Sequence, residues 1–322
     1  MFGVYRTILA AVVALSHFGL VIHGFNPGKW SVLSFYVVSG FLMANVFPKL
    51  SVGGQWRWFY IDRAMRIYPL FLCVLLIFGI GLHYPWRQTG INALLFPLSY
   101  CVFTGVDPII DPTWSLACEM HFYMLVPLLV NASTHTLRAL MVGSIILFSI
   151  SPFVAHPAYW AYGSLPGILF SFLSGMLIQR KDTAWLRRVW MVFAALLALF
   201  GYSKVAHFGW PTGVHIDVCI GYLISLPVVS RLARLSPNHK WDQRLGLLCY
   251  PLFLVHSPLD NLWGFHHLPQ LNMLGRLLLS VAASALLVLA VERPFDRLRY
   301  KLRQRPTQRA PLPHGGLVPT RF

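Results

Sequence analysis

Ten mostly apolar stretches of about 17 to 20 residues constrain the fold of this chain more than any other feature. A run of this length is what an α-helix needs to cross the hydrocarbon core of a bilayer. Because hydrocarbon offers the backbone no hydrogen-bond partner, each crossing stretch is expected to be helical. The predicted spans are residues 5–23, 31–48, 67–84, 114–130, 138–155, 162–179, 186–202, 214–232, 245–263 and 273–292.

The composition supports a membrane protein and excludes several soluble classes. Charged residues are only 11% of the chain, against about 25% in soluble proteins. The net charge of +16 does not indicate nucleic-acid binding, because the basic residues flank apolar runs, where they match the positive-inside bias and contact anionic lipid head groups. None of the five cysteines forms a C-x-x-C pair, so neither a disulfide framework nor a metal site is expected.

Charge placement predicts the orientation. The linkers 49–66, 180–188 and 231–244 are rich in arginine and lysine, so all should face the cytoplasm. They lie on one side only if the short apolar piece 90–104, which contains Pro97, does not cross. We therefore expect 90–104 to be re-entrant or interfacial. The predicted fold is an all-α polytopic membrane protein of about ten transmembrane helices with both termini in the cytoplasm.

The domain organisation is simple. Residues 1–296 are predicted to form one transmembrane domain, and residues 297–322 a basic, disordered cytoplasmic tail, since they lack apolar periodicity. The first apolar segment is interpreted as a retained helix rather than a removed signal peptide.

Arg6 and His17 are ionisable residues in the first span, where charge is costly. Eleven helical residues come to nearly three turns, so both side chains lie on one face, about 16 Å apart along the axis. Arg6 would lie at the cytoplasmic mouth and His17 deep in the membrane. The alternative is an arginine that snorkels to lipid phosphate and a histidine bonded to a neighbouring helix.

Glu119 is the second intramembrane candidate, in the stretch DPTWSLACEMHFY. Ser115 and Tyr123, four residues away on either side, share its helical face. On the predicted topology Glu119 lies at a depth similar to that of His17, which would allow the two to meet. Glu292, the other glutamate, is interpreted as a structural anchor that pairs with a nearby arginine.

The pair Arg63 and Arg66 occupies one helical face at the edge of the third span. Arginine suits bidentate phosphate contacts, although a positive-inside cluster would look the same. His256 is a lone histidine in the ninth predicted span, and Ser39, with Gly40, would also suit close helix packing.

Together, the order and spacing of these motifs resemble acyltransferase family 3, the membrane-bound bacterial enzymes that O-acylate sugars, lipids and antibiotics. The resemblance covers nearly the whole chain. Its elements are R-x(10)-H from Arg6 to His17, S-G-F from Ser39 to Phe41, F-Y-x-D-R-x-x-R-I-Y-P from Phe59 to Pro69, W-S-L-x-x-E-x-x-F-Y from Trp114 to Tyr123, L-G-x-x-x-Y-P-L-F-L-x-H from Leu245 to His256 and E-R-P-F from Glu292 to Phe295.

The resemblance implies a ten-helix membrane domain that uses an acyl-CoA donor, commonly acetyl-CoA. It also implies that Arg6, His17, Arg63 and Arg66 are needed for activity. Some members have a cysteine-free, more polar pattern where this chain has Ala117 and Cys118. The periplasmic domain that some members append has no counterpart here, so we expect this chain to finish the transfer alone or to hand the acyl group to a separate protein.

These inferences give a functional hypothesis. An acyl group, commonly acetyl, moves from cytoplasmic acyl-CoA to a hydroxyl of a surface glycan, lipopolysaccharide or glycolipid at the bacterial inner membrane. His17 is the general base, and Glu119 orients it, as in a hydrolase triad. Acyl-CoA is the donor substrate, and no bound cofactor is expected. The predicted CoA-binding residues are Arg6, Arg63 and Arg66, and the predicted substrate-binding residues are Ser39, Trp114, Ser115, Tyr123 and His256.

Two alternatives stay open at this level. In the first, Ser39, Ser115 or Cys118 acts as an acyl relay, which carries the acyl group covalently between donor and acceptor. A glycolipid or polysaccharide transporter would also explain the spans and an intramembrane His/Glu proton relay. Acyl-CoA consumption favours the enzyme, whereas substrate movement without acyl-CoA favours the transporter.

Overall fold

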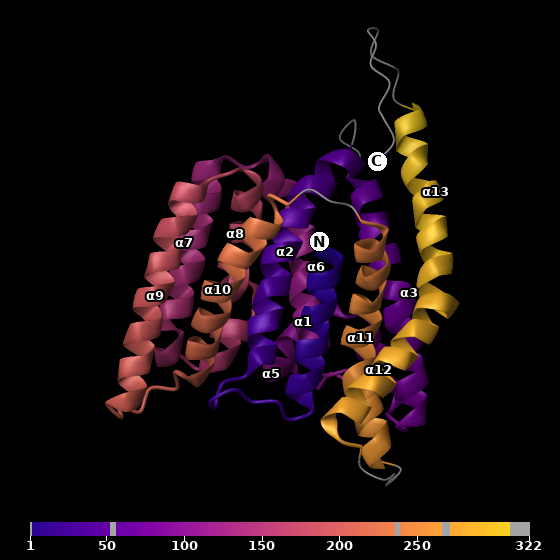
Figure 1. Ribbon diagram of the computed structural model, residues 1–322, viewed down its shortest axis with the longest axis horizontal. Helices are drawn as coiled ribbons and strands as arrows, with labels where there is room; N and C mark the ends of the chain where they lie inside the picture. The colour runs from indigo at the N-terminus through magenta and orange to yellow at the C-terminus, as the bar shows by residue number, and fades with distance from the viewer. Residues whose placement is uncertain (1, 52–55, 236–238, 266–270, 310–322) are drawn as a thin grey trace.

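The structure is a computed structural model that describes residues 2–51, 56–235, 239–265 and 271–309. These residues form helices and short loops and contain no β-strand (Figure 1). The helices are α1 Phe2–His17, α2 Pro27–Leu50, α3 Arg57–Gly81, α4 Trp86–Ala93, η2 Phe96–Tyr100, α5 Cys101–Thr104, α6 Thr113–Asn131, α7 Thr134–Ile150, η3 Ser151–Phe153, η4 Tyr159–Gly163, α8 Leu165–Gln179, α9 Thr183–Val205, α10 Gly213–Leu232, α11 Lys240–Phe265, α12 Met273–Leu287, η5 Val288–Glu292 and α13 Arg293–Arg309.

The helices confirm an all-α polytopic membrane protein. In the described part of the chain, eight helical segments are long and apolar enough to cross a bilayer. The other two predicted spans fall on α1, which has 16 residues, and on α11, which has 26. Many large apolar side chains on the outside of the bundle are exposed, such as Leu76, Leu128 and Ile146. A surface of this kind suits lipid rather than water.

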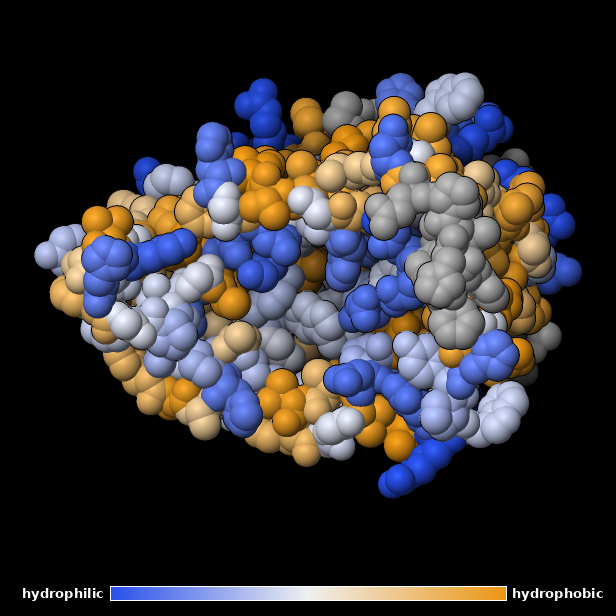
Figure 2. Space-filling model, turned by 90° about the horizontal axis from the view of Figure 1, so that it is seen from below, coloured by the Kyte–Doolittle hydropathy of each residue, from blue (hydrophilic) through white to orange (hydrophobic). Residues whose placement is uncertain are grey.

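The segment predicted not to cross is broken into α4, η2 and α5, which have eight, five and four residues. Eight helical residues rise about 12 Å, far less than the hydrocarbon thickness of about 30 Å. Because this segment does not cross, the helices that precede the basic linkers run in the same direction. The carboxyl ends of α2, α8, α10 and α13 lie at one end of the bundle (Figure 1). Figure 2 shows the opposite end, where hydrophilic residues gather on the end face and hydrophobic residues lie around its rim.

Two sequence predictions differ from the structure. The first helix ends at His17 and not near residue 23, because Gly19 has a φ of 105° and turns the chain. The tail predicted to be disordered from residue 297 is helical up to Arg309. Ion pairs hold the first part of this helix to α3, and Arg299 supplies one of them to Asp62. Residues 310–322 lie outside the described residues.

A close crossing of α2 and α8 fixes the centre of the bundle. A Cβ atom on Gly40 would lie 1.9 Å from the Phe172 carbonyl oxygen, and one on Gly175 would lie 2.0 Å from the Val37 carbonyl oxygen. The two backbones therefore touch, as small residues allow in membrane helices. Gly40 serves packing, while its neighbour Ser39 faces α6.

Candidate active site

Two adjoining cavities, of about 580 Å³ and about 440 Å³, share five lining residues and are called here together the central cavity. It lies between α1, α2, α3, α6 and α11. One part is lined by Arg63 and Arg66, and the other reaches Ser115 and Phe253. The shared residues are Arg6, Phe35, Leu116, Glu119 and Tyr250.

Glu119 is held at the wall of this cavity by two neighbours. Its Oε1 atom accepts hydrogen bonds from the hydroxyls of Ser39, at 2.5 Å, and Tyr123, at 2.6 Å. Tyr123 is one helical turn further along α6, which is the face that the sequence pattern predicted. Among the described residues Oε2 of Glu119 has no hydrogen-bond partner, so it is left for a ligand.

Arg6 lines both parts of the cavity, and its side chain has no hydrogen bond or ion pair within the described residues. Its position is set by the first turn of α1. The carboxylate of Asp242 in α11 accepts hydrogen bonds from the amides of Gly3, at 3.1 Å, and Val4, at 2.9 Å. Thr7 also donates to the Leu245 carbonyl, at 2.8 Å. A positioned guanidinium without a protein partner is a ready anion site.

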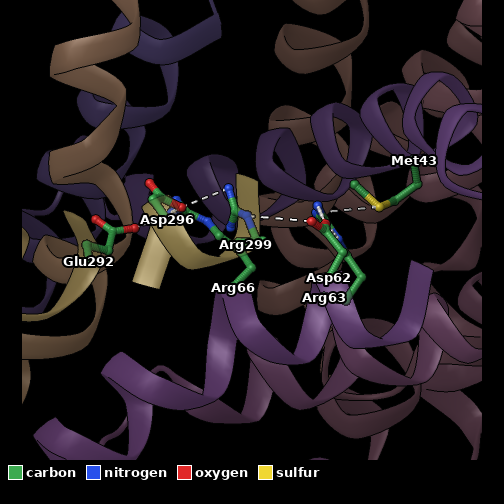
Figure 3. A network of polar contacts seen from close by, with 7 residues as sticks. All are labelled: Met43, Asp62, Arg63, Arg66, Glu292, Asp296 and Arg299. Atoms are coloured by element: carbon green, nitrogen blue, oxygen red, sulfur yellow. Dashed lines mark hydrogen bonds and ion pairs between the residues drawn. The ribbon is translucent and has the colours of Figure 1, made fainter. Parts of the chain in front are cut away.

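Arg63 and Arg66, by contrast, are already paired in a network between α3 and α13 (Figure 3). Arg63 forms an ion pair with the adjacent Asp62, and Arg66 forms one with Glu292. Arg299 lies 3.5 Å from the Asp62 carboxylate. The prediction that Glu292 anchors the last span through an arginine is confirmed, and Arg66 is that arginine.

The predicted contact between His17 and Glu119 does not occur among the described residues. Glu119 lies at the level of Arg6, and three helical turns, about 16 Å, separate Arg6 from His17. The ring of His17 instead lies 5.0 Å from the ring of His256. The carboxylates whose charges act on His17 are Asp111 and Asp260.

Asp111 is fixed beside these histidines by α11. The hydroxyl of Ser257, the residue after His256, donates a hydrogen bond to the Asp111 carboxylate. Phe253, which lines the central cavity, packs against the His256 ring with centroids 6.4 Å apart. One aromatic side chain therefore lies between the cavity and the His17–His256 pair.

The other predicted substrate residues divide into two groups. Ser39, Ser115 and Tyr123 line the central cavity, and Ser115 donates to the Pro112 carbonyl at 2.8 Å. Trp114 faces elsewhere and packs on Tyr162, with ring centroids 4.9 Å apart. His256 lines a third, separate cavity.

The alternative acyl relay at Cys118 has little geometric support. Its thiol is buried and lies 3.3 Å from the Gly163 carbonyl, and Cys118 does not line the central cavity. Ser39 and Ser115 do line it, but each hydroxyl already donates to a protein acceptor.

Sequence reasoning missed several residues that the structure brings to the site. Tyr250 lines both parts of the central cavity and donates to the Ile67 carbonyl at 2.8 Å. Asp111 directly precedes the P-T-W-S-L motif. Asp260 and Arg276 are charged residues close to or within apolar runs. That placement is the sequence signal that would have identified them as candidate site residues.

The chain is similar to known proteins along most of its length. A family model described as "Acyltransferase domain" matches residues 4–293. An uncharacterized protein of Aquifex aeolicus (strain VF5) is 26% identical over 201 residues, which cover 60% of this chain and 90% of that protein. Nodulation protein 10 of Rhizobium leguminosarum bv. viciae is 23% identical over 358 residues, 94% of each chain. No solved structure matches. Because the family model covers nearly the whole chain, this protein belongs to acyltransferase family 3.

Proposed function

We propose that this protein is an O-acyltransferase of the bacterial inner membrane that moves an acyl group, commonly acetyl, from cytoplasmic acyl-CoA to a hydroxyl of a surface glycan, lipopolysaccharide or glycolipid. One observation carries the proposal. One part of the central cavity is lined by Arg6, Arg63 and Arg66, and the adjoining part, which Arg6 also lines, reaches Phe253 beside the His17–His256 pair.

The arginines support a polyanionic donor such as CoA. Arg6 has no partner among the described residues and meets the donor's phosphates without losing a protein contact. Arg63 and Arg66 are paired with Asp62 and Glu292, so the phosphates compete with these carboxylates. Glu119 then serves the donor rather than the base, because it lines the cavity together with Arg6 and its Oε2 atom, which has no partner among the described residues, can accept an amide N–H from the pantetheine arm.

The proposed chemistry needs one proton acceptor. The acceptor hydroxyl attacks the thioester carbonyl, so that an O–C bond forms and the C–S bond breaks. His17 takes the hydroxyl proton and returns it to the departing CoA thiolate. Asp111 and Asp260 stabilise the imidazolium of His17 by their charge. No covalent acyl-enzyme is required.

The test uses membranes from cells that express the full chain or its His17→Ala variant, supplied with labelled acetyl-CoA. Removing a general base slows such a transfer by about 10²- to 10⁴-fold. Label in surface glycans and lipids, analysed by mass spectrometry, is the measurement. His135→Ala, an exposed histidine in the first turn of α7, is the matched control and should keep full transfer.

Full acylation by the His17→Ala membranes would refute the assignment of the base. Movement of a glycolipid across the membrane without acyl-CoA consumption would favour a transporter instead.

A further inference from the structure

The part of the central cavity that measures about 440 Å³, called here the inner part, differs in character from the part at Arg63 and Arg66. The residues that line only the inner part are uncharged at neutral pH. They are Val32, Tyr36, Ser115, Cys249 and Phe253. Beyond Arg6, a phosphate therefore meets no further cation in this lining, whereas an apolar group meets a largely apolar surface.

Three residues of α11 show how far the inner part reaches. Tyr250, Phe253 and His256 follow one another at intervals of three residues, and each interval rises about 4.5 Å along the helix. Tyr250 lines both parts of the central cavity, Phe253 lines the inner part alone, and His256 lines neither. The central cavity therefore stops at the level of Phe253, one interval short of the His17–His256 pair.

The ring of Phe253 closes this end of the cavity. Phe253 is only 9% exposed, and its ring packs edge-on against that of Phe35, with centroids 6.0 Å apart. The same ring lies 6.4 Å from that of His256, which in turn lies 5.0 Å from the ring of His17. Side chains packed in this way accept additional atoms only if they shift, and that shift costs free energy.

The acyl group is the leading end of a donor whose phosphates bind the arginines. In acetyl-CoA only a methyl group precedes the thioester carbon, so this carbon can come up to the Phe253 ring. In a longer acyl-CoA the additional methylenes need the space that the ring fills. They therefore hold the thioester carbon further from His17.

We propose that Phe253 is the residue that sets the length of the transferred acyl group. Its ring forms the closed end of the inner part and restricts the donor to acyl-CoA with a very short chain. This assignment rests on the proposed function and names the donor class of the same site. Phe253 acts by its volume alone and takes no part in proton transfer.

The test is a competition between two donors in membranes from cells that express the full chain. Acetyl-CoA and butyryl-CoA, which carry different isotope labels, are supplied together at equal concentrations. The ratio of the two labels in surface glycans and lipids gives the ratio of the two kcat/KM values. This ratio does not depend on how much folded protein the membranes contain. Membranes with the His17→Ala variant supply the background.

One methylene more or less in a hydrophobic pocket changes kcat/KM by about 10- to 200-fold. Butyryl carries two more methylenes than acetyl, so the unchanged protein should prefer acetyl-CoA by at least about 100-fold. Phe253→Ala opens the end of the inner part and should lower this preference by at least about tenfold. Phe253→Leu removes less volume and should lower it in the same direction by a smaller factor.

The matched control is Phe193→Ala, which truncates an equally apolar, buried ring. Phe193 packs against Phe170, with ring centroids 4.7 Å apart, and lines neither part of the central cavity. Its label ratio should equal that of the unchanged protein. An equal loss of preference in Phe193→Ala would overturn the proposal, because general loosening of the bundle would then explain the effect.

Two other results would also overturn the assignment of Phe253 while His17-dependent transfer persisted. The first is equal use of both donors by the unchanged protein, or a label ratio that neither Phe253 variant changes. The second is a Phe253→Leu protein that is present in the membrane but transfers neither group. Failure of the proposed function looks different, because then neither label depends on His17 even in the unchanged protein.

Discussion

The two ends of the bundle differ in how deeply their ion pairs are buried and in which polar groups are left without a protein partner. At the arginine end, which is the level of Arg63 and Arg66, the guanidiniums are paired with carboxylates in a network that joins α3 to α13 (Figure 3). At the histidine end, which is the level of His17 and His256, a buried nitrogen has no partner among the described residues. Arg6 lies between the two ends and is unpaired within the described chain.

This difference separates groups that hold helices from groups left for ligands. Removing one partner of a buried ion pair is strongly destabilising, because it leaves a buried charge without compensation. A polar group that faces a cavity and has no protein partner contributes little to folding, so removing it should hardly change the free energy of unfolding of the protein without substrate. Substitutions at the arginine end should therefore mainly lower the stability of the protein. Substitutions of Arg6 and at the histidine end should mainly change the substrate kinetics.

Breaking a pair at the arginine end should have the largest effect on stability. Glu292→Gln removes the nearer of the two carboxylates that pair with the guanidinium of Arg66, which is 17% exposed, and leaves only Asp296 at 3.9 Å. Loss of one member of such a buried pair costs about 3–5 kcal/mol, which denaturation of the purified protein in nanodiscs would measure.

Asp260→Asn is the matched change at the histidine end. Its pair with Arg276 is 29% and 28% exposed, so the expected loss is only about 0–1 kcal/mol. Equal losses at the two ends would contradict the comparison.

Arg6→Ala should change donor binding and leave stability nearly unaltered. A hydrogen bond to a charged group is worth about 1.5–3 kcal/mol, which corresponds to about a 10- to 100-fold rise in the KM for acetyl-CoA. Steady-state kinetics in nanodiscs would measure it, with Arg6→Lys as the charge-conserving control. Glu119→Gln should raise the same KM in the same direction. An unchanged KM combined with a large loss of stability would show that Arg6 is structural.

A small effect on stability is also expected at Asp242, which fixes the start of α1 and thereby places Arg6. Burial raises the pKa of the Asp242 carboxyl, but hydrogen bonds and positive charge near it, including the bonds from the amides of Val4 and Gly3, bring the pKa below its ordinary value. Asp242→Asn should cost about 1 kcal/mol, as loss of a helix cap does.

The pH dependence of this contribution has a definite sign. Because the folded pKa is the lower one, the stabilisation is complete above the unfolded pKa, about 3.9, and is lost as the pH falls through the folded value. Melting curves of the two proteins should therefore differ at neutral pH and converge in acid. A difference that is independent of pH would exclude the carboxylate as its cause.

Much of the fold follows directly from the sequence. Apolar length predicts where helices lie, and the placement of basic linkers predicts that residues 90–104 do not cross, since both depend on local composition alone. The shared face of Ser115, Glu119 and Tyr123 also follows from helical periodicity, and all three line the central cavity. The anchoring role of Glu292 was predictable because a buried carboxylate needs a cation.

Only the tertiary structure decided which side chains the polar residues contact and how deep in the bundle each one lies. Periodicity gives the face of a helix but not its height relative to a neighbour, so Glu119 was predicted beside His17 and lies instead with Ser39, Tyr123 and the cavity at Arg6. The end of α1 depends on the turn at Gly19, which brings His17 to the helix terminus and into contact with His256. The sequence determined which residues are costly in a membrane, whereas helix packing decided which are paired and which are left to bind substrate.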